Sequence, residues 1–327
     1  MKKVIYFSLL FLFLISCKSK KITIGILIYD ESDTFMGEYT NNIIEQLPEQ
    51  VSYTINYSEN SQALQNEQLI SFLQKGVDLM IVNPVDRLAC KSITELCAKN
   101  NVSLIFINRE PLLSDISFYE DVYYVGSDPK NQGISQAQMI ANLFGSPNNL
   151  NYDRNADNKI QLLVLKGEQN HQDAESRTRF ALEELNKLGY ELEVLDIQVC
   201  NWRRQEAYTT IKSLYSLYGA ELELIIANND DMALGAIDYF KEIDLFKSSE
   251  TFEQPIVVVG VDGTKVGVDS VNQGLMYGTI LNDSLSQSKA VISLLRKILN
   301  LNPEEVFPYA FENNKFIYIA GEKITQN

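Results

Sequence analysis

The most informative part of the sequence is KGEQNHQDAESR, which runs from Lys166 to Arg177. It contains His171, the only histidine among the 327 residues, with Asp173 two positions later. It directly follows an apolar run at 160–165 that predicts a strand, and ligands bind beyond the carboxyl ends of strands in open α/β sheets. An imidazole, an acceptor-only carboxylate and a guanidinium with N–H donors suit a neutral ligand covered in hydroxyls. A phosphate would be repelled by Asp173.

Short β-rich runs alternate along the chain with amphipathic segments of helix length. This alternation is typical of parallel sheets with helices on both faces. The strands are too numerous for one sheet, so we expect an α/β fold of two similar lobes, each a parallel sheet flanked by helices, with a boundary near Gly126–Ser127. The expected strands are 21–29, 51–56, 77–82, 102–107, 160–165, 191–197, 222–227 and 255–261. The expected helices are 33–47, 61–75, 86–100, 130–144, 173–188, 203–217 and 232–243.

Polar residues recur where these strands end. Asn108, Asn229 and Asp262 each come at or just beyond the end of an expected strand, and Asn282 follows a further apolar run. Each of them has an alternative role as a helix N-cap or a turn residue. Their recurrence in both lobes is better explained by one cleft between the lobes.

The N-terminus predicts export and a lipid anchor. Lys2 and Lys3 precede an apolar core at 4–15 that is too short to span a bilayer and is typical of a signal peptide. The core ends in Leu-Ile-Ser-Cys, which resembles the lipobox of bacterial lipoproteins. We therefore expect residues 1–16 to be removed, Cys17 to be acylated and residues 17–21 to form a short tether to the membrane. The alternative is an ordinary secretory peptide with a chance cysteine.

Charge and cysteine usage exclude several classes of protein. The formal net charge is −15, which argues against nucleic acid and anionic lipid surfaces as partners. Cys90 and Cys97 are seven residues apart on one expected helix, about 10 Å along its axis and too far to be bridged. Together with Cys200 they are expected to be free, buried thiols.

Several motifs resemble those of a known family. In order they are YDESDTFM, FINREP, YYVGSD, KGEQNHQDAESRT, IIANNDDMALGA, VVGVDG and GTILNDS. Their order and spacing are similar to those of the galactose/glucose-binding proteins of bacterial ABC sugar importers. The resemblance implies a first lobe of 22–127 plus 283–311, a second lobe of 128–282 plus 312–327, and three hinge crossings. It also implies a monomer that captures D-glucose or D-galactose between the lobes and delivers it to an ABC permease.

The resemblance assigns a sugar site residue by residue. Phe35 and Trp202 resemble aromatic residues that stack on opposite faces of the sugar, and Arg109 stands where relatives often have lysine, as a supporting residue. Carboxylates accept from hydroxyls, a guanidinium donates and amides do both, so the chemistry agrees with a hexose. The expected sugar-binding residues are Asp33, Phe35, Asn108, His171, Asp173, Arg177, Trp202, Asn229, Asp262 and Asn282.

A second motif predicts a structural calcium site. Asp153, Asn155, Asp157, Lys159 and Gln161 place oxygen donors at positions 1, 3, 5, 7 and 9, as in an EF-hand loop, with Lys159 using its backbone carbonyl. The resemblance supplies Glu223 as the remaining carboxylate. Asn158 replaces the usual glycine at some cost to the turn. Arg154 and Lys159 add positive charge, so we expect weaker binding than in relatives with neutral residues there. The alternative is a solvated polar loop.

Two other functions use the same residues. A sugar sensor that presents its ligand to a chemoreceptor would have the same site. A glycosidase would use paired acids such as Asp33 and Asp262, but the sequence shows no clear nucleophile and base. The choice between glucose and galactose is left open, because an aspartate such as Asp33 accepts from a 4-hydroxyl in either epimer.

Overall fold

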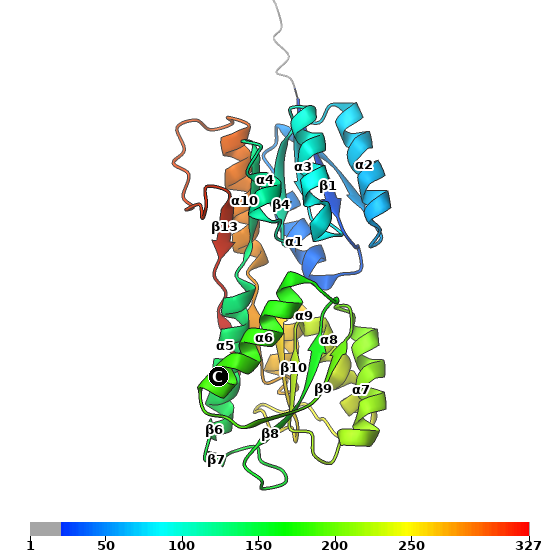
Figure 1. Ribbon diagram of the computed structural model, residues 1–327, viewed down its shortest axis with the longest axis vertical. Helices are drawn as coiled ribbons and strands as arrows, with labels where there is room; N and C mark the ends of the chain where they lie inside the picture. The colour runs from blue at the N-terminus through cyan, green and yellow to red at the C-terminus, as the bar shows by residue number, and fades with distance from the viewer. Residues whose placement is uncertain (1–20, 327) are drawn as a thin grey trace, which may run out of the picture.

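The computed structural model describes residues 21–326, so the expected signal peptide and Cys17 lie outside the described residues. Two α/β lobes are stacked along the long axis of the molecule (Figure 1). The sheet of the first lobe has the order β13-β5-β4-β3-β1-β2 and is parallel throughout. Its first elements are β1 (Ile22–Ile28), α1 (Thr34–Glu45), β2 (Val51–Tyr57), α2 (Gln62–Lys75), β3 (Leu79–Val82), η1 (Arg87–Ala89), α3 (Cys90–Lys99), β4 (Ser103–Ile107), α4 (Leu113–Ile116) and β5 (Val122–Ser127).

The second lobe repeats the architecture. Its sheet has the order β14-β12-β11-β10-β8-β9, in which only β14 is antiparallel to its neighbour. The two-lobe α/β prediction is confirmed. The elements are α5 (Pro129–Phe144), β6 (Gly145–Ser146), β7 (Asn149–Leu150), β8 (Ile160–Lys166), α6 (Gln172–Lys187), β9 (Leu192–Val199), α7 (Arg204–Tyr218), β10 (Leu224–Ala227), α8 (Asp230–Glu242), β11 (Val257–Asp262), α9 (Lys265–Asn272) and β12 (Gly278–Leu281).

The last part of the chain crosses between the lobes twice more. After β12 it enters the first lobe as α10 (Ser284–Ile298), which packs against α1 (Figure 1). The strand β13 (Phe316–Ile319) then extends the first sheet beside β5, and β14 (Lys323–Thr325) pairs with β12 in the second. The expected assignment of all of 312–327 to the second lobe is therefore wrong for β13, and the last crossing lies between Ile319 and Lys323.

Each sheet has a hydrophobic core on both faces. Along β1, Ile24, Ile26 and Ile28 contribute to one core and Leu27 to the other, as the alternation of side chains along a strand requires. Strands buried on both faces are near-continuous apolar runs, which is why the sequence predicts them well. Because all these parallel strands run the same way, their carboxyl ends meet at one edge of each lobe, and the two edges face each other.

The three cysteines within the described residues are free and buried, as predicted for Cys90, Cys97 and Cys200. Burial raises the pKa of the Cys97 thiol to about 12, so it is an unreactive packing group. Over residues 21–326, every helix is too short or too polar to cross a bilayer.

Candidate functional site

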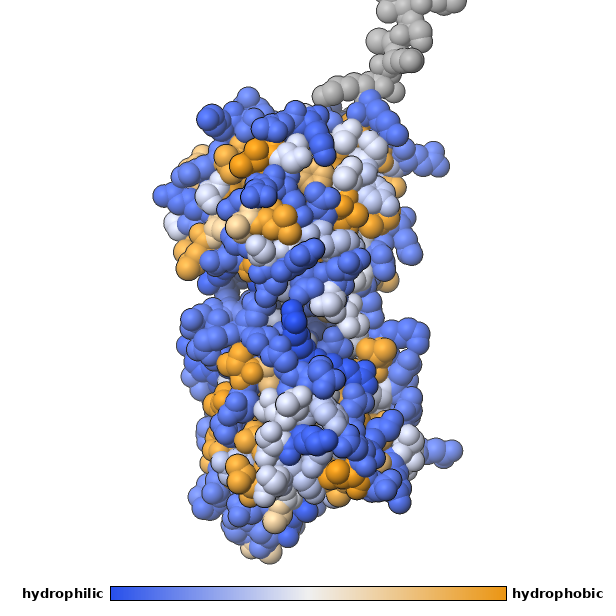
Figure 2. Space-filling view, turned by 90° about the vertical axis from the view of Figure 1, so that its right-hand side faces the viewer, coloured by the Kyte–Doolittle hydropathy of each residue, from blue (hydrophilic) through white to orange (hydrophobic). Residues whose placement is uncertain are grey.

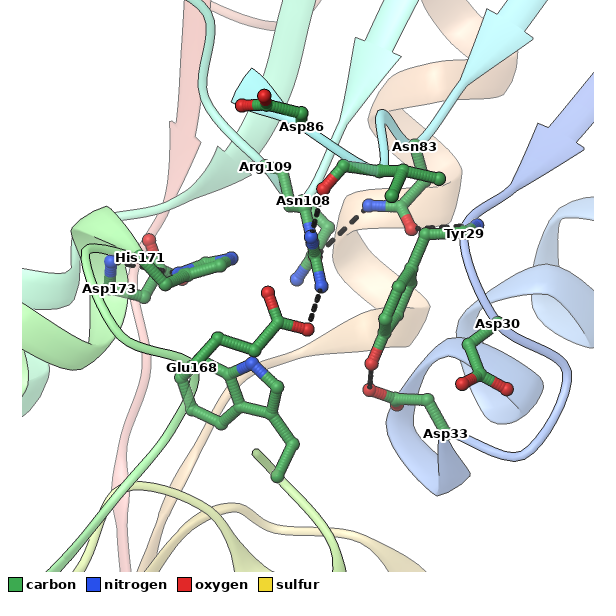
Figure 3. Close-up of polar contacts among 12 residues, drawn as sticks. Tyr29, Asp30, Asp33, Asn83, Asp86, Asn108, Arg109, Glu168, His171 and Asp173 are labelled. Atoms are coloured by element: carbon green, nitrogen blue, oxygen red, sulfur yellow. Dashed lines mark hydrogen bonds and ion pairs between the residues drawn. The ribbon is translucent and has the colours of Figure 1, made fainter. Parts of the chain in front are cut away.

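A small cavity lies between the facing edges of the two sheets, and its space measures about 330 Å³ when the part open to solvent is included. Nine of the ten predicted sugar-binding residues line it; Asn282 is the exception. Both lobes contribute: of the nine, Asp33, Phe35 and Asn108 belong to the first lobe and the other six to the second. Asp33, Asn108, His171 and Asp173 are among the residues drawn in Figure 3. The lining residues are Tyr29, Asp33, Phe35, Asn108, Arg109, His171, Asp173, Arg177, Trp202, Asn229 and Asp262.

Three of these residues are also helix N-caps. Asp33 Oδ1 accepts a hydrogen bond from the Met36 N–H at 2.8 Å at the start of α1. His171 caps α6 through its Nδ1, and Asn229 caps α8 through its Oδ1. The capping and binding interpretations are therefore compatible. A cap fixes the side chain at a helix start, and the parallel topology directs that start towards the cleft.

Three further residues of the cavity hold unusual backbone conformations. Asn108, Trp202 and Asp262 have φ values of 60°, 66° and 119°. Such a conformation is disfavoured for a bulky residue such as Trp202 and persists only where the surroundings enforce it. The Asn229 side chain donates to the Trp202 carbonyl at 3.1 Å, and the Tyr124 hydroxyl donates to the Asn108 carbonyl at 2.8 Å. These bonds hold the strained segments against the cavity.

The guanidinium of Arg177 organises the second-lobe side of the cavity. Its Nε donates to Gln132 Oε1 at 2.8 Å and its Nη1 to the Asn228 carbonyl at 2.9 Å. Its Nη2 lies 3.4 Å from Asp173 Oδ2. Burial raises the pKa of Asp173, and Arg177 opposes that rise. Asp173 is thus a carboxylate with few protein partners, held beside a fixed cation.

The imidazole of His171 is neutral in this environment. Burial, together with the charges of Arg109 and Arg177, holds its pKa well below the usual value. Nδ1 accepts from the Asp173 N–H at 3.2 Å, so the imidazole proton lies on Nε2. The ring meets the edge of Trp202 at 5.0 Å between centroids. His171 therefore offers one N–H donor to a ligand.

Arg109 and Tyr29 complete the wall of the cavity. The Arg109 guanidinium lies 3.9 Å from the centroid of the Tyr29 ring, and its Nη2 pairs with Glu168 Oε1 of the second lobe at 2.8 Å (Figure 3). The Tyr29 hydroxyl donates to Asp33 Oδ2 at 2.6 Å. Tyr29 was not predicted as a lining residue, because the expected strand at 21–29 included it, whereas β1 ends at Ile28 in the structure.

Asn282 lies behind the cavity. Its Nδ2 donates to Asp262 Oδ1 at 3.3 Å, and its Oδ1 accepts from Gln287 Nε2 at 2.7 Å. Both functional ends of the amide are thus occupied within the protein. Burial, with repulsion from Asp230 and Asp33, raises the pKa of Asp262 well above its usual value. The structure places Asn282 as a support for Asp262.

Direct contacts between the lobes close the cleft. The Thr34 hydroxyl donates to Asp231 Oδ2 at 2.7 Å, and Arg203 Nη2 lies 3.2 Å from Asp30 Oδ2. The Arg109–Glu168 ion pair is a third such contact. The structure is therefore that of the closed form, in which lining residues from both lobes surround one volume.

The predicted calcium loop folds around its own oxygen atoms. Asp153 Oδ2 accepts from the Asn158 N–H at 2.9 Å, and Asn158 has a φ of 61°, the left-handed conformation expected of it. Asn155 and Gln161 both direct their amide nitrogens at Asp157 Oδ2. Glu223, which directly precedes β10, accepts hydrogen bonds from the backbone N–H groups of Arg154 and Gln161. The fold of the loop thus brings together all the side chains that were predicted to supply oxygen ligands to the ion.

Two observations on this loop fit a cation. Gln161 Oε1 is buried and has no hydrogen-bond partner. Burial, together with Asp153 and Asp157, raises the pKa of Glu223 to about 7. Within residues 21–326, no three His, Cys, Asp or Glu side chains cluster closely enough to hold a metal by themselves, so amide and backbone oxygens would have to contribute.

The two basic side chains of the loop have partners elsewhere. Arg154 Nη1 donates to the carbonyls of Gly219 and Leu222, at 3.0 and 2.7 Å. Lys159 Nζ lies 3.5 Å from Glu191. Both side chains thus have partners outside the loop.

Two α/β lobes, three crossings between them and a polar cavity at their junction define a solute-binding protein that closes around its ligand. The chain belongs to the periplasmic binding protein family, since the model described as "Periplasmic binding protein domain" matches residues 24–303. It is 35% identical over 274 residues to the D-galactose/methyl-galactoside binding periplasmic protein of Haemophilus influenzae, covering 83% of this chain and 80% of that protein. A xylitol-binding protein of Mycolicibacterium smegmatis is 24% identical, over 87% of this chain and 75% of that protein.

Solved structures share the fold. An ABC transporter solute-binding protein from Bacillus halodurans with bound myo-inositol matches with a TM-score of 0.76 at 21% identity, covering 95% of this chain and 96% of that one. One from Actinobacillus succinogenes with bound D-allose has the same TM-score at 20% identity, covering 94% and 98%. The family consists of solute receptors that are not enzymes, which excludes the glycosidase alternative.

Proposed function

We propose that this protein is the hexose-binding component of an ABC importer, with D-glucose or D-galactose as its ligand. The observation that carries the proposal is the composition of the cavity. It combines the acceptors Asp33, Asp173 and Asp262 with the donor Arg177. The galactoside-binding relative at 35% identity supports this assignment.

A hexose would supply what the cavity needs. Burial raises the pKa values of Asp173 and Asp262, so hydrogen-bond donors from a ligand would stabilise their ionised forms. Sugar hydroxyls donate and accept together, so they would supply donors to both carboxylates and acceptors to Arg177 and His171. Phe35 and Trp202, one from each lobe, offer apolar surface for the C–H groups of the ring.

Closure would couple binding to delivery. The ligand contacts both lobes, and the direct contacts between the lobes form only when the cleft is shut. A sugar therefore favours the closed form by the difference in its affinity for the two forms. A permease would recognise the closed arrangement and release the sugar by separating the lobes.

Titration calorimetry on the chain from Lys18, which keeps every described helix and strand, tests which sugar the protein binds. It compares the affinities for D-glucose, D-galactose and D-ribose. Asp33→Ala and Asp173→Ala should each lower hexose affinity at least tenfold, because buried partners lose their hydrogen bonds. Asp121→Ala, at an exposed aspartate, serves as the control. Hexose affinity within twofold of wild type in both cavity variants would refute the assigned site.

The proposal includes a lipid anchor at Cys17 and a place in the cell envelope. The sequence at residues 14–17 supports it, and a tether of a few residues would keep the first lobe within about 13 Å of the membrane. Cys17→Ala should move the protein from the detergent phase to the aqueous phase in phase partition and should abolish incorporation of labelled fatty acid. A wild-type protein that is already in the aqueous phase would indicate an ordinary secreted protein.

The loop at 153–161 is proposed to hold a structural Ca²⁺. Asp153, Asp157 and Glu223 would supply charge, while Asn155, Gln161 and the Lys159 carbonyl would supply neutral oxygens. Gln161 Oε1 is buried without a hydrogen-bond partner, whereas Nε2 of the same amide faces Asp157. If the amide is turned so that its oxygen and nitrogen exchange places, the oxygen faces Asp157 and can bind the ion together with it. Ca²⁺ should raise the melting temperature and EDTA should reverse the rise. An unchanged melting temperature would indicate a solvated loop.

The partner is proposed to be an ABC sugar permease. A chemoreceptor would read the same closed form, so the two roles differ only in the partner. Crosslinking of the sugar-loaded protein in intact cells, followed by mass spectrometry, separates them. Recovery of a permease supports transport, and recovery of a chemoreceptor alone contradicts it.

A further inference from the structure

Gln132 lies behind the cavity, between Arg177 and the first crossing of the chain between the lobes. Its side chain is buried and does not belong to the lining of the cavity. Its Oε1 accepts from Arg177 Nε at 2.8 Å, and its Nε2 donates to Ser127 Oγ at 3.1 Å. Because a guanidinium has donors and no acceptor, the amide oxygen has to face Arg177, which leaves the amide nitrogen for Ser127. One buried amide therefore connects a residue of the cavity to the hinge.

The bond to Gln132 helps to determine which N–H groups Arg177 offers to a ligand. A guanidinium carries five N–H groups, one on Nε and two on each Nη nitrogen. Gln132 accepts from Nε, the Asn228 carbonyl from Nη1 and Asp173 from Nη2. Five less these three leaves two N–H groups, one on each Nη nitrogen. Because all three nitrogens are held, the plane of the guanidinium and the direction of the two remaining donors are fixed.

The helices that carry Gln132 and Arg177 are in close backbone contact at the same place. Gly133 follows Gln132 on α5, and a Cβ added there would lie 2.7 Å from the backbone oxygen of Arg177 on α6. The first turns of α5 thus hold Arg177 at two points, its backbone beside Gly133 and its guanidinium at Gln132. A displacement of this part of α5 would therefore displace Arg177 as well.

The helix α5 begins at the hinge. Ser127 is the last residue of β5 in the first lobe, where its register partner is Ile319 of β13. In the second lobe α5 starts two residues later at Pro129, with Asp128 as its N-cap. The crossings lie at the left of the junction in Figure 1, whereas the opposite side, which faces the viewer in Figure 2, is hollowed and hydrophilic. The Gln132–Ser127 bond thus spans the hinge on the side of the junction away from this hollow.

Opening of the lobes would act on this bond. Rotation about the crossing between Ser127 and Pro129 moves Ser127 with the first lobe and Gln132 with the second, so the distance between the two side chains changes. We propose that Gln132 is a positioning residue that couples the hinge to Arg177, so that closure of the lobes fixes the guanidinium in the orientation in which it donates to the sugar. This inference rests on the proposed hexose-binding function and adds to it a residue that does not touch the ligand.

The test compares variants of Gln132 with a variant of a matched glutamine. Gln132→Met removes both polar contacts and keeps the length of the side chain, whereas Gln132→Glu keeps an acceptor for Arg177 and can accept from the Ser127 hydroxyl. Ser127→Ala removes the hinge bond alone. The control is Gln136→Met, because Gln136 is buried on the same helix and its amide donates to backbone carbonyls of β10 and β11 instead.

Calorimetry measures the affinity of each variant for D-glucose and D-galactose, and for deoxy analogues of the better ligand, each of which lacks one hydroxyl. Gln132→Met should weaken hexose binding at least about tenfold and Ser127→Ala about fivefold, while Gln132→Glu should stay within about threefold of wild type. The loss should concern one hydroxyl, so the deoxy analogue that lacks the hydroxyl bound by Arg177 should bind to wild type and to Gln132→Met with affinities within about threefold of each other. Gln136→Met should lower the melting temperature but leave hexose affinity within about threefold of wild type.

Three results would overturn the inference and leave the proposed function intact. The first is an equal loss for the hexose and for all its deoxy analogues in Gln132→Met, which would make Gln132 a structural residue. The second is an equal loss in Gln136→Met, and the third is wild-type affinity in Ser127→Ala, which would separate Arg177 from the hinge. If Gln132→Met does not fold, Ser127→Ala with the same analogues decides. Absence of hexose binding in the wild-type protein would overturn the proposed function, and the inference with it.

Discussion

The hydroxyl of Thr34 donates to the carboxylate of Asp231 at 2.7 Å across the cleft, joining the first turns of α1 and α8. Asp231 also accepts from the Thr34 backbone N–H, and these bonds partly offset the rise that burial causes in the pKa of Asp231. Both groups belong to helix N-termini, where a carboxylate is favoured. The Thr34–Asp231 hydrogen bond therefore stabilises the closed form, although neither residue lines the sugar cavity.

Thr34→Val should weaken sugar binding about fivefold. The variant keeps the side-chain shape and removes the hydroxyl, and one hydrogen bond contributes about 1 kcal/mol net. The loss should be the same for every hexose, because the contact acts on closure and not on recognition. Calorimetry measures it, with Thr209→Val on the exposed face of α7 as the control. A loss confined to one epimer would contradict this role.

Gly167→Ala should weaken sugar binding at least tenfold. A Cβ at Gly167 would lie 2.2 Å from Cζ2 of Trp202, so the indole would have to move. The left-handed backbone of Trp202 leaves little freedom to do so. Gly37→Ala, with no atom within 4 Å of the added methyl group, should leave binding unchanged and slightly stabilise α1. Equal affinities in the two variants would show that the indole position is unimportant.

Stability should fall as pH rises from about 4 to about 7. Burial raises the pKa of Asp230 to about 7, while an unfolded aspartate titrates near 4. Between these values the folded state holds a proton that the unfolded state has lost, so each increase in pH favours unfolding. Urea unfolding across this range measures the slope. Asp230→Asn should flatten it, and the exposed control Asp121→Asn should not; identical slopes would contradict the assignment.

Calcium affinity should fall about tenfold between pH 8 and pH 6. The ion would bind the ionised form of Glu223, whose pKa is raised to about 7, so binding would release a proton below that value. Calorimetry with Ca²⁺ at several pH values tests this. Glu223→Gln should bind Ca²⁺ at least tenfold more weakly, with a flatter pH profile and unchanged sugar affinity. A pH-independent wild-type affinity would exclude Glu223 as a ligand.

Much of the cleft could be predicted because its residues follow apolar strands. Ile160–Lys166 and Leu224–Ala227 are buried runs with clear ends, so the polar residues after them were assigned to one edge. Asn282 shares that position, yet it contacts Asp262 and Gln287 instead of the cavity. Position along a strand determines which edge a side chain occupies, but packing determines whether it reaches the ligand.

Other features depended on pairing between distant residues. The strand series omitted β5 and β12, which contain glycine and polar residues and so form weaker apolar runs. Phe316–Ile319 was assigned to the wrong lobe, since nothing local distinguishes the partner strands β5 and β12. The mouth of the cleft is likewise formed by loops whose contacts, such as Asp30 with Arg203, join residues 173 positions apart.

The last two strands, β13 and β14, join different sheets, and this constrains the order in which the lobes can be completed. Each sheet receives an edge strand from within 316–325, so neither lobe has its full set of strands until these residues have been synthesised. A nascent chain stopped at residue 312 would expose the open edges of β5 and β12 together, and unpaired edges invite aggregation. The two lobes therefore reach their full sets of strands at the same late stage of folding, once residues 316–325 have joined them.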